Sequence, residues 1–302
     1  MAKSEHKISA ASKPQDPSSQ LDLRPGQSIE LLKELHILTR DGKLNLDSRR
    51  KLKQVYHLFQ FIEKLLKELP VSDKGPTLAD HGAGKSYLGF IIYDLFFKSL
   101  DKGSIFGIET RSELVASSQA LAQRLGFDRM KFLNLSVAES AQSDTLPDQI
   151  DVVTALHACD TATDDAMAFG LQKKVKYMVL VPCCQAELAR ALNQNKALNL
   201  QRTPLAELWR HPLHTREMGS QLTNVLRCLY LEAMGYQVTV TELVGWEHSM
   251  KNELILAKYT GQKKRSSEER LQALLHEFGL ETLLDTRFTL SVDNSLDNQK
   301  TP

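Results

Sequence analysis

The sequence predicts a Rossmann-like α/β fold, a seven-stranded and mostly parallel sheet with helices packed on it. Strand and helix patterns alternate along residues 77–184, which is typical of a parallel sheet with right-handed crossovers. The segments 151–158 and 176–184 are so apolar that both faces of these strands should be covered. Residues 236–245 and 251–260 are two strand patterns close together in the chain, so a hairpin should give the sheet an antiparallel last strand.

Each element follows from a local pattern. In residues 48–69 apolar residues recur at steps of three and four, which is typical of one face of a helix. Pro70 and the turn residues after it separate this helix from the sheet, and Gly126 is the expected C-cap of a helix over 111–126. The remaining strands are expected at 77–80, 104–109 and 130–136, and the remaining helices at 85–100, 161–174, 220–235 and 266–279.

These patterns divide the chain into four segments. The first is a polar tail that we expect to be disordered, and the second is a helical N-terminal extension. The third is the domain that holds the sheet, with a polar, basic insertion on its substrate side, and the fourth is a helix with a polar tail. Their ranges are 1–20, 21–75, 76–260 with the insertion at 186–218, and 261–302.

Composition limits the classes of function. The chain has 302 residues, 42% of them hydrophobic and 25% charged, and a formal net charge of +1, so no global field draws it to nucleic acid or anionic lipid. No apolar run approaches membrane-spanning length, and the first residues lack the apolar core of a signal peptide. The four cysteines form no C-x-x-C pair, so disulfides are not expected. We therefore expect a cytoplasmic protein without a membrane partner.

A glycine-rich turn, HGAGKS, follows the first predicted strand. A phosphate-binding loop would end in the same Gly-Lys-Ser, but its first glycine would fall on Ala79. The residues present are instead an acid, Asp80, followed by Gly82 and Gly84 at D-x-G-x-G spacing. The sequence of this turn therefore argues against an enzyme that binds and hydrolyses nucleoside triphosphates.

An acid at such a turn repels a pyrophosphate but suits a ligand with an ammonium group, such as S-adenosylmethionine, while the glycines let the backbone approach it closely. A second acid, Glu109, ends the next strand, where it can accept hydrogen bonds from both ribose hydroxyls. The alternative for Glu109 is an acid that only favours the helix macrodipole. We predict that Asp80, Gly82, Ala83, Gly84 and Glu109 bind this cofactor.

Two further strand ends supply candidates for the site. Ser136 and Val137 follow the third strand and could frame an adenine, although a plain loop explains them equally well. His157 and Asp160 follow the fourth strand, at the edge where open α/β sheets bind ligands, and are candidate catalytic residues, His157 also as a cofactor contact. Nearby, Thr161-x-x-Asp164 has the spacing of a capping box.

The pair Cys183-Cys184 follows the fifth strand, and three roles compete for it. With His157 and Cys159 it could bind zinc, although the spacing is not that of a C-x-x-C site and we predict no metal. Cys183 could act as a nucleophile in methylation of a pyrimidine carbon. The favoured role is that small, rigid residues here shape a substrate pocket.

Several of these motifs together resemble one family. LADHGAGKSYL, IFGIETRSEL, DVVTALHACDTATDDAM, VPCCQAEL, REMGSQLTNVLRCLYLEAMGY and KNELILAKY are similar to a class I S-adenosylmethionine-dependent methyltransferase-like family, over about residues 45 to 260. Its relatives include the methyltransferase half of the glutathione-S-transferase-C-terminal-domain-containing protein and, more distantly, a tRNA 2′-O-methyltransferase. The resemblance implies a seven-stranded sheet with a final antiparallel strand and a cofactor site at Asp80, Gly82, Gly84 and Glu109. His81 and Ser86 depart from the usual loop, which often has an apolar or small residue and a third glycine there.

The substrate is predicted from local basic patches, and RNA, either tRNA or rRNA, is favoured. We predict substrate contacts by Gln185, Arg216, Lys251 and Asn252. A protein or small-molecule substrate is the alternative, and a catalytically silent binding module is a second one. A ring-nitrogen acceptor would need mainly positioning, whereas an oxygen acceptor would need a base such as His157 or Asp160. The basic patches are Arg49 to Lys53, the insertion's Arg202, Arg210, His211, His214 and Arg216, and Lys263 to Arg265.

Overall fold

The computed structural model divides the chain into two compact units, residues 1–52 and 53–302. It describes residues 23–44, 46–156, 160–182, 187–195, 204–243 and 253–290. In the first unit, helix α1 (Ile29–Glu34) begins at Ser28, whose Oγ accepts a hydrogen bond from the amide of Leu31 at 3.1 Å. Leu31 and Leu32 of this helix are fully buried. Helix α2 (Leu46–Lys67) starts in this unit and ends in the second.

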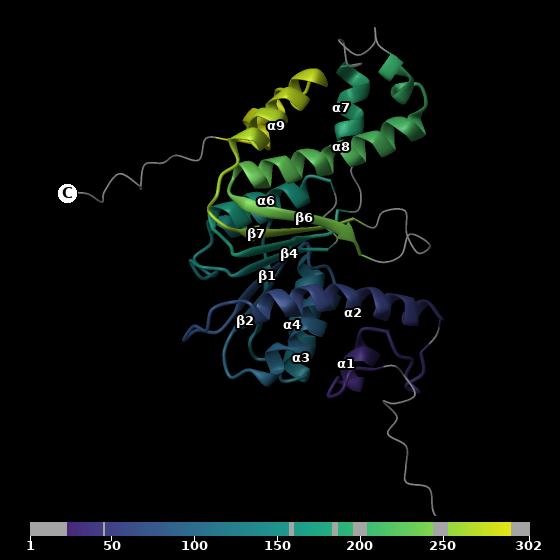
Figure 1. Cartoon of the computed structure of the whole chain (residues 1–302). Helices are drawn as coiled ribbons and strands as arrows, with labels where there is room; N and C mark the ends of the chain where they lie inside the picture. Colours follow the sequence, from purple (N-terminus) through teal and green to yellow (C-terminus); the bar gives the residue numbers. More distant parts are fainter. Residues whose placement is uncertain are drawn as a thin grey trace, which may run out of the picture. The chain divides into compact units, whose positions relative to one another are not determined.

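The second unit contains a seven-stranded sheet of order β3-β2-β1-β4-β5-β7-β6 (Figure 1). β1 to β5 pair in parallel, and β7 lies antiparallel to both β5 and β6. The predicted fold, with its hairpin and antiparallel last strand, is therefore confirmed. The strands are β1 (Thr77–His81), β2 (Ser104–Glu109), β3 (Met130–Asn134), β4 (Val152–Ala155), β5 (Tyr177–Leu180), β6 (Tyr236–Glu242) and β7 (Glu253–Tyr259).

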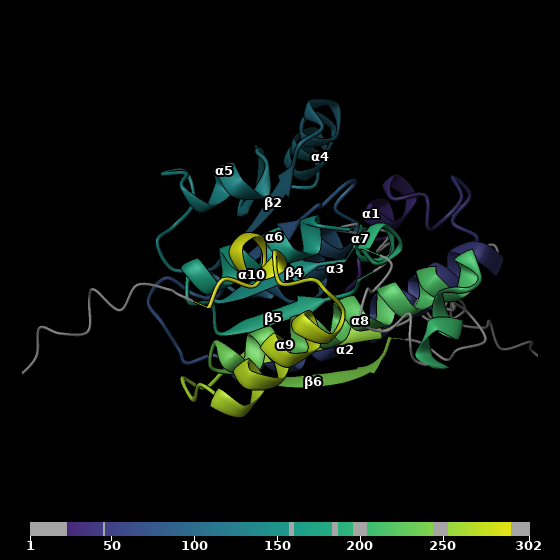
Figure 2. The ribbon, with the colours of Figure 1, turned by 90° about the horizontal axis from the view of Figure 1, so that it is seen from above.

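Helices cover both faces of this sheet, as the apolar strands β4 and β5 require. Figure 1 shows α6, α8 and α9 on one face and α3 and α4 on the other. Seen from above in Figure 2, α8 and α9 lie side by side near β6. The helices are α3 (Tyr87–Leu95), α4 (Ser112–Arg124), α5 (Val137–Ala141), α6 (Ala162–Gln172), α7 (Glu187–Asn195), α8 (Pro212–Ala233), α9 (Arg265–Glu277) and α10 (Leu283–Thr286), with 3₁₀ turns η2 (Phe97–Ser99) and η4 (Pro204–Trp209).

The region 186–218 contains more regular structure than its polar composition suggested. Leu188 and Leu192 are buried on one side of α7, so this short helix has an apolar face that the sequence analysis overlooked. α8 begins at Pro212, eight residues before the expected start, because Pro at the first helical position needs no N–H partner. α7 and α8 pack tightly where Gly219 meets Ala189, since a Cβ on Gly219 would lie 2.9 Å from the Ala189 nitrogen.

Two other local predictions differ from the structure. The segment after β3 is a short helix, α5, rather than a loop. Thr161 does precede α6, but its side chain makes no capping hydrogen bond, and Asp164 pairs with arginines instead. The capping box that the spacing suggested is thus not formed. Within the described residues no helix is both long and apolar enough to cross a membrane.

Candidate functional site

The turn between β1 and α3 has the backbone shape that glycine permits. Gly82, Gly84 and Ser86 all have positive φ, at 64°, 56° and 52°. Its amides donate inside the protein: Ala83 N to Ile108 O at 3.2 Å, Gly84 N to a Glu109 oxygen at 2.8 Å, and Ser86 N to Ala83 O at 2.6 Å. A phosphate loop needs such amides turned toward the ligand, so this arrangement opposes triphosphate binding. Lys85 is exposed to solvent.

Asp80 lies under this turn, within β1. Its side chain is buried, with 3% of the residue exposed, and its Oδ1 accepts a hydrogen bond from Thr154 Oγ1 of β4 at 2.6 Å. Burial raises the pKa of Asp80 to about 7, although the hydrogen bond from Thr154 lowers it. Among the described residues no cation balances this carboxylate, so the site favours a positively charged ligand group.

Glu109 ends β2 and receives several donors. Its Oε1 accepts the backbone N–H of Arg111 at 3.1 Å and Nε of the same arginine at 3.0 Å, and its Oε2 accepts the Gly84 amide. Burial alone would raise the pKa of Glu109, but the hydrogen bonds from Arg111 and the two amides outweigh it and hold the pKa below its ordinary value. Asn134 Nδ2 donates to the Glu109 carbonyl oxygen at 3.1 Å, which fixes the backbone at this strand end.

Two tight contacts lie close to the turn. A Cβ on Gly107 of β2 would lie 2.6 Å from the Phe132 ring, and one on Gly89 of α3 would lie 2.5 Å from Ser86 Oγ. Both positions therefore need glycine unless neighbouring atoms move. Ser86 Oγ is buried and has no hydrogen-bond partner among the described residues. Strand periodicity did not indicate Gly107, because its partner Phe132 lies on another strand, β3.

Ser136 has a structural role at the N-terminus of α5. Its Oγ accepts the Glu139 amide at 3.2 Å, while Glu139 Oε2 accepts the Ser136 amide at 2.7 Å, which together form a capping box. The spacing S-x-x-E could have been recognised in the sequence. Val137 is partly buried against the apolar core. The predicted role of Ser136 and Val137 at the adenine stays a prediction.

His81 points into the core from the face of β1 opposite to Asp80. The residue is fully buried, its ring packs edge-on against Phe169 with 4.5 Å between centroids, and neither nitrogen has a hydrogen-bond partner among the described residues. Burial lowers the pKa of His81 to about 3, so the ring is neutral at ordinary pH.

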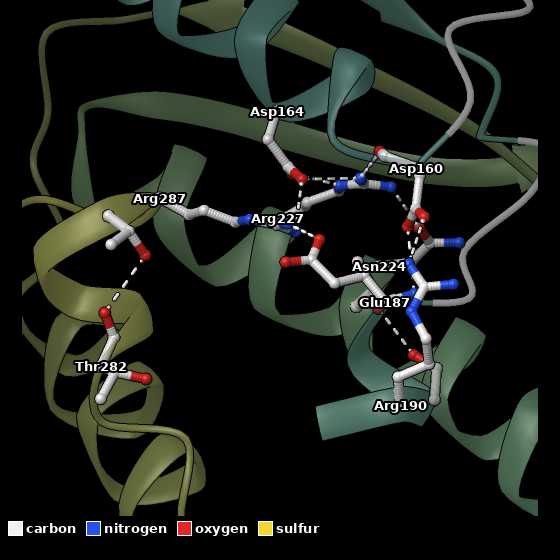
Figure 3. A network of polar contacts seen from close by, with 11 residues as sticks. Asp160, Asp164, Glu187, Arg190, Asn224, Arg227, Thr282 and Arg287 are labelled. Carbon is white, nitrogen blue, oxygen red and sulfur yellow. Dashed lines mark hydrogen bonds and ion pairs between the residues drawn. The ribbon is translucent and has the colours of Figure 1, made fainter. Parts of the chain in front are cut away.

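Asp160 begins the second half of the site, beyond β4. It has a positive φ of 54°, a conformation that is uncommon for a residue other than glycine. Its carboxylate accepts the Glu187 amide at the start of α7 and Nη2 of Arg190, each at 3.2 Å (Figure 3). The predicted catalytic carboxylate is thus placed at the expected edge of the sheet, where α7 holds it.

Arg227 of α8 organises the polar contacts around Asp160 (Figure 3). This arginine is fully buried and binds both oxygens of Asp164, with Nε to Oδ1 at 2.6 Å and Nη2 to Oδ2 at 3.0 Å. Nη2 also donates to the Asp160 carbonyl oxygen at 2.8 Å. Arg287, from the segment after α10, adds an ion pair to Asp164 at 3.1 Å and another to Glu187. Four parts of the chain are therefore tied together beside the end of β4.

The sequence analysis missed Arg227 as well as Glu253, which starts β7 and accepts a hydrogen bond from Asn224 Nδ2 at 2.6 Å. One feature of the sequence could have indicated Arg227: this arginine follows Leu226, on the apolar side of a segment with a strong helical pattern. A buried arginine requires an anionic partner, but the sequence does not say which acid supplies it.

Several predicted site residues lie outside the described residues, and so does the set considered for zinc. Among the described residues no group of three or more His, Cys, Asp or Glu side chains could hold a metal ion. Cys228 is described and is a free thiol, and burial raises its pKa to about 12. The predicted residues outside the described ranges are His157, Cys159, Cys183, Cys184, Gln185, Lys251 and Asn252.

The predicted basic residues that are described lie at the surface, and several are paired. Arg210 contacts Glu207 and Arg216 contacts Glu217, each at 3.0 Å, near the start of α8. Lys264 and Arg265 contact Glu232 and Glu269. His211 and His214 are exposed, and their rings meet edge-to-face at 5.3 Å. The patches at the start of α8 and before α9 are therefore less positive than their basic residues alone suggest, because nearby acids compensate part of the charge.

Part of the chain is similar to known proteins. Residues 50–191 match a family model described as a methyltransferase domain. A glutathione S-transferase C-terminal domain-containing protein homolog of Drosophila pseudoobscura pseudoobscura is 23% identical over 213 residues, which are 64% of this chain and 34% of that protein. The Xenopus laevis protein is 22% identical over 234 residues, 72% of this chain and 35% of that one. The chain thus spans about a third of the length of these curated relatives.

Among solved structures, magnesium protoporphyrin IX methyltransferase from Synechocystis PCC 6803, with bound S-adenosylhomocysteine, has a TM-score of 0.45 and 14% identity. The match covers 76% of this chain and 93% of that one.

Proposed function

We propose, from the match of residues 50–191 to a methyltransferase domain family, that the chain is an S-adenosylmethionine-dependent methyltransferase acting on RNA. The observation that carries the proposal is the pair of acids at the ends of β1 and β2, with the glycine turn between them. When bound, S-adenosylmethionine supplies an electrophilic methyl group, and the chain's own residues must hold the cofactor and the acceptor.

Asp80 fits the ammonium end of this cofactor. The carboxylate is buried with a raised pKa, and an ammonium group nearby would stabilise its ionised form. The same site would disfavour a phosphate, both through the charge of Asp80 and through the inward donation of the amides in the turn. The pattern of donors and charge thus supports a cationic ligand over ATP.

Glu109 fits the ribose end. It accepts two backbone amides, which hold the carboxylate in place, and two further hydrogen bonds from the Arg111 side chain, Nε at 3.0 Å and Nη2 at 3.3 Å. The Arg111 side chain is 60% exposed, so its hydrogen bonds are exchanged at small cost. We expect the two ribose hydroxyls to replace these side-chain donors while the amides keep their bonds.

RNA as the acceptor is supported by exposed cations next to exposed apolar side chains. Arg210 and Arg216 flank Leu213 at the start of α8, and the Leu213 residue is 56% exposed. Phosphates can draw such arginines from the acids that they contact, while an apolar side chain can pack on a base. A protein or small-molecule acceptor is the alternative, and the second step of the test distinguishes them.

The test begins with calorimetric titration of the purified chain with S-adenosylmethionine and, separately, with ATP. We expect micromolar binding of S-adenosylmethionine alone, lost in Asp80→Ala and kept in Asp101→Ala, an exposed aspartate that serves as the matched control. Binding of ATP, or no binding of either, would contradict the proposed cofactor. RNA from a strain that lacks the gene should then accept labelled methyl groups. A chain that binds the cofactor but leaves this RNA unlabelled would have another acceptor.

A further inference from the structure

The buried contacts around Arg227 fix the orientation of one amide. Arg227 Nη1 donates to Asn224 Oδ1 at 3.3 Å, and an arginine has no acceptor to offer in return. The Asn224 oxygen must therefore face Arg227, and its Nδ2 must face away. Only 5% of Asn224 is exposed, so solvent does not compete for this arrangement.

The oriented amide in turn fixes a carboxylate. Asn224 Nδ2 donates to Glu253 Oε2 at 2.6 Å, while no other described residue donates to the Glu253 side chain. One oxygen of Glu253 is thus held, and within the described part of the chain the other has no donor and can accept a hydrogen bond. Glu253 is half-buried, so water competes less with a ligand for its second oxygen.

The position of Glu253 places it at the ligand edge of the sheet. β7 runs antiparallel to β5, so the first residue of β7 lies beside the carboxyl end of β5, two residues beyond the Leu180–Ile255 pair. Ligands of open α/β sheets bind outside these strand ends. The same set of contacts joins Asp160 to Arg227, and through Asn224 to Glu253, so both carboxylates belong to one rigid group.

We propose that Glu253 binds the acceptor, and that its second oxygen accepts a hydrogen bond from a donor group of the target nucleoside, either a base N–H or a ribose hydroxyl. The proposal rests on the proposed function and adds a specific contact to it. A carboxylate repels a phosphate, so this contact selects the nucleoside itself rather than the RNA backbone. Three arginines, Arg190, Arg227 and Arg287, pair with the carboxylates of Asp160, Asp164 and Glu187, whereas the Glu253 carboxylate contacts only the Asn224 amide among the described residues.

The decisive variant is Glu253→Gln. Asn224 will hold the amide oxygen of the glutamine, so its NH₂ group will face the acceptor and a donor will replace an acceptor. We expect kcat/KM for RNA from the deletion strain to fall about 10- to 100-fold. Glu253→Ala removes the oxygen without adding a donor and should lose less than Glu253→Gln. A merely structural role would give the opposite order, since the glutamine keeps the bond to Asn224.

The matched control is Glu242→Gln. Glu242 pairs with Glu253 across β6 and β7 and is exposed, so this variant makes the same change of charge at the same strand end without an orienting amide. Its activity should stay near that of the unmodified chain. Equal loss in both glutamine variants, or none in Glu253→Gln, would overturn the proposal for Glu253.

Two further measurements separate this proposal from the proposed function. Calorimetry should give the same affinity for S-adenosylmethionine in all three variants, which also shows that they are folded. If the unmodified chain binds no S-adenosylmethionine, both proposals fail; if it methylates RNA and Glu253→Gln does so equally well, only the role of Glu253 fails. Mass analysis of the labelled nucleoside then shows whether the methyl group lies on a base or a ribose.

Discussion

The two halves of the candidate site are built in different ways. At the ends of β1 and β2, Glu109 binds Arg111, two residues away in the sequence, and the Gly84 amide, 25 residues away. Beyond β4, Arg227 binds Asp164 across 63 residues, and Arg287 reaches Asp164 across 123. The first half uses backbone donors and nearby side chains, whereas the second depends on charged side chains from distant helices.

This difference predicts that the two halves of the site respond differently when one side chain is removed. Backbone donors in a turn persist when one side chain is changed, and the ion pair of an exposed arginine such as Arg111 contributes little to stability because solvent screens it. A buried ion pair is stable only while both partners are present, because removing one leaves an uncompensated charge in a poorly solvated place. The half beyond β4 should therefore be rigid, but the loss of one charged side chain should destabilise it.

The largest expected effect comes from Arg227→Met. This change leaves Asp164 with Arg287 alone and removes the donor to the Asp160 carbonyl oxygen, so the free energy of unfolding should fall by about 3–5 kcal/mol. Urea denaturation measures it. Arg216→Met, on the same helix but 56% exposed, should lower it by less than about 1 kcal/mol. Similar values for the two variants would show that the buried ion pairs do not stabilise the fold.

Asp80→Asn should change the free energy of unfolding by a smaller amount, and in the opposite direction: it should stabilise the fold at high pH. The pKa of Asp80 in the folded chain is about 7, above its ordinary value near 4, so the folded state gains stability from the bound proton below pH 4 and loses it as pH rises through 7. Without cofactor, the variant should therefore be more stable than the unmodified chain at pH 8 by about 2–4 kcal/mol, and nearly equal to it at pH 4. Denaturation curves at the two pH values measure the difference. A difference in stability between the two proteins that does not grow with pH would contradict a buried Asp80 carboxyl with a raised pKa.

The smallest effect is expected for Ser136→Ala, which removes the capping box of α5. The loss should be about 1 kcal/mol in the free energy of unfolding, while Ser117→Ala, at an exposed position inside α4, should be close to neutral. Titration with S-adenosylmethionine sharpens the comparison. If Ser136 is only a cap, affinity will be unchanged, and a tenfold loss would instead support its predicted place at the adenine.

The sequence by itself determined the fold class and the placement of an acid at the end of each of the first two strands, with a glycine turn between them. Alternation of strands and helices predicted the parallel sheet, and the hairpin pattern predicted the antiparallel edge, whereas the order of the strands came from the structure. Positive φ at Gly82 and Gly84 follows from the residue type, and Asp80 and Glu109 could be identified because each ends a recognisable strand. All these features depend on residues close together in the chain.

Only the tertiary structure decided the other half. Arg227 lies inside the predicted part of α8, yet its partners Asp164 and Asp160 become neighbours only when α8 packs over the sheet beside α6. Glu253 is one of many acids in the sequence, and the orienting bond from Asn224 distinguishes it. His81 likewise looked like part of the turn but lies in the core against Phe169. Local patterns record backbone preference and burial, whereas the pairing of side chains is fixed by packing between elements far apart in the chain.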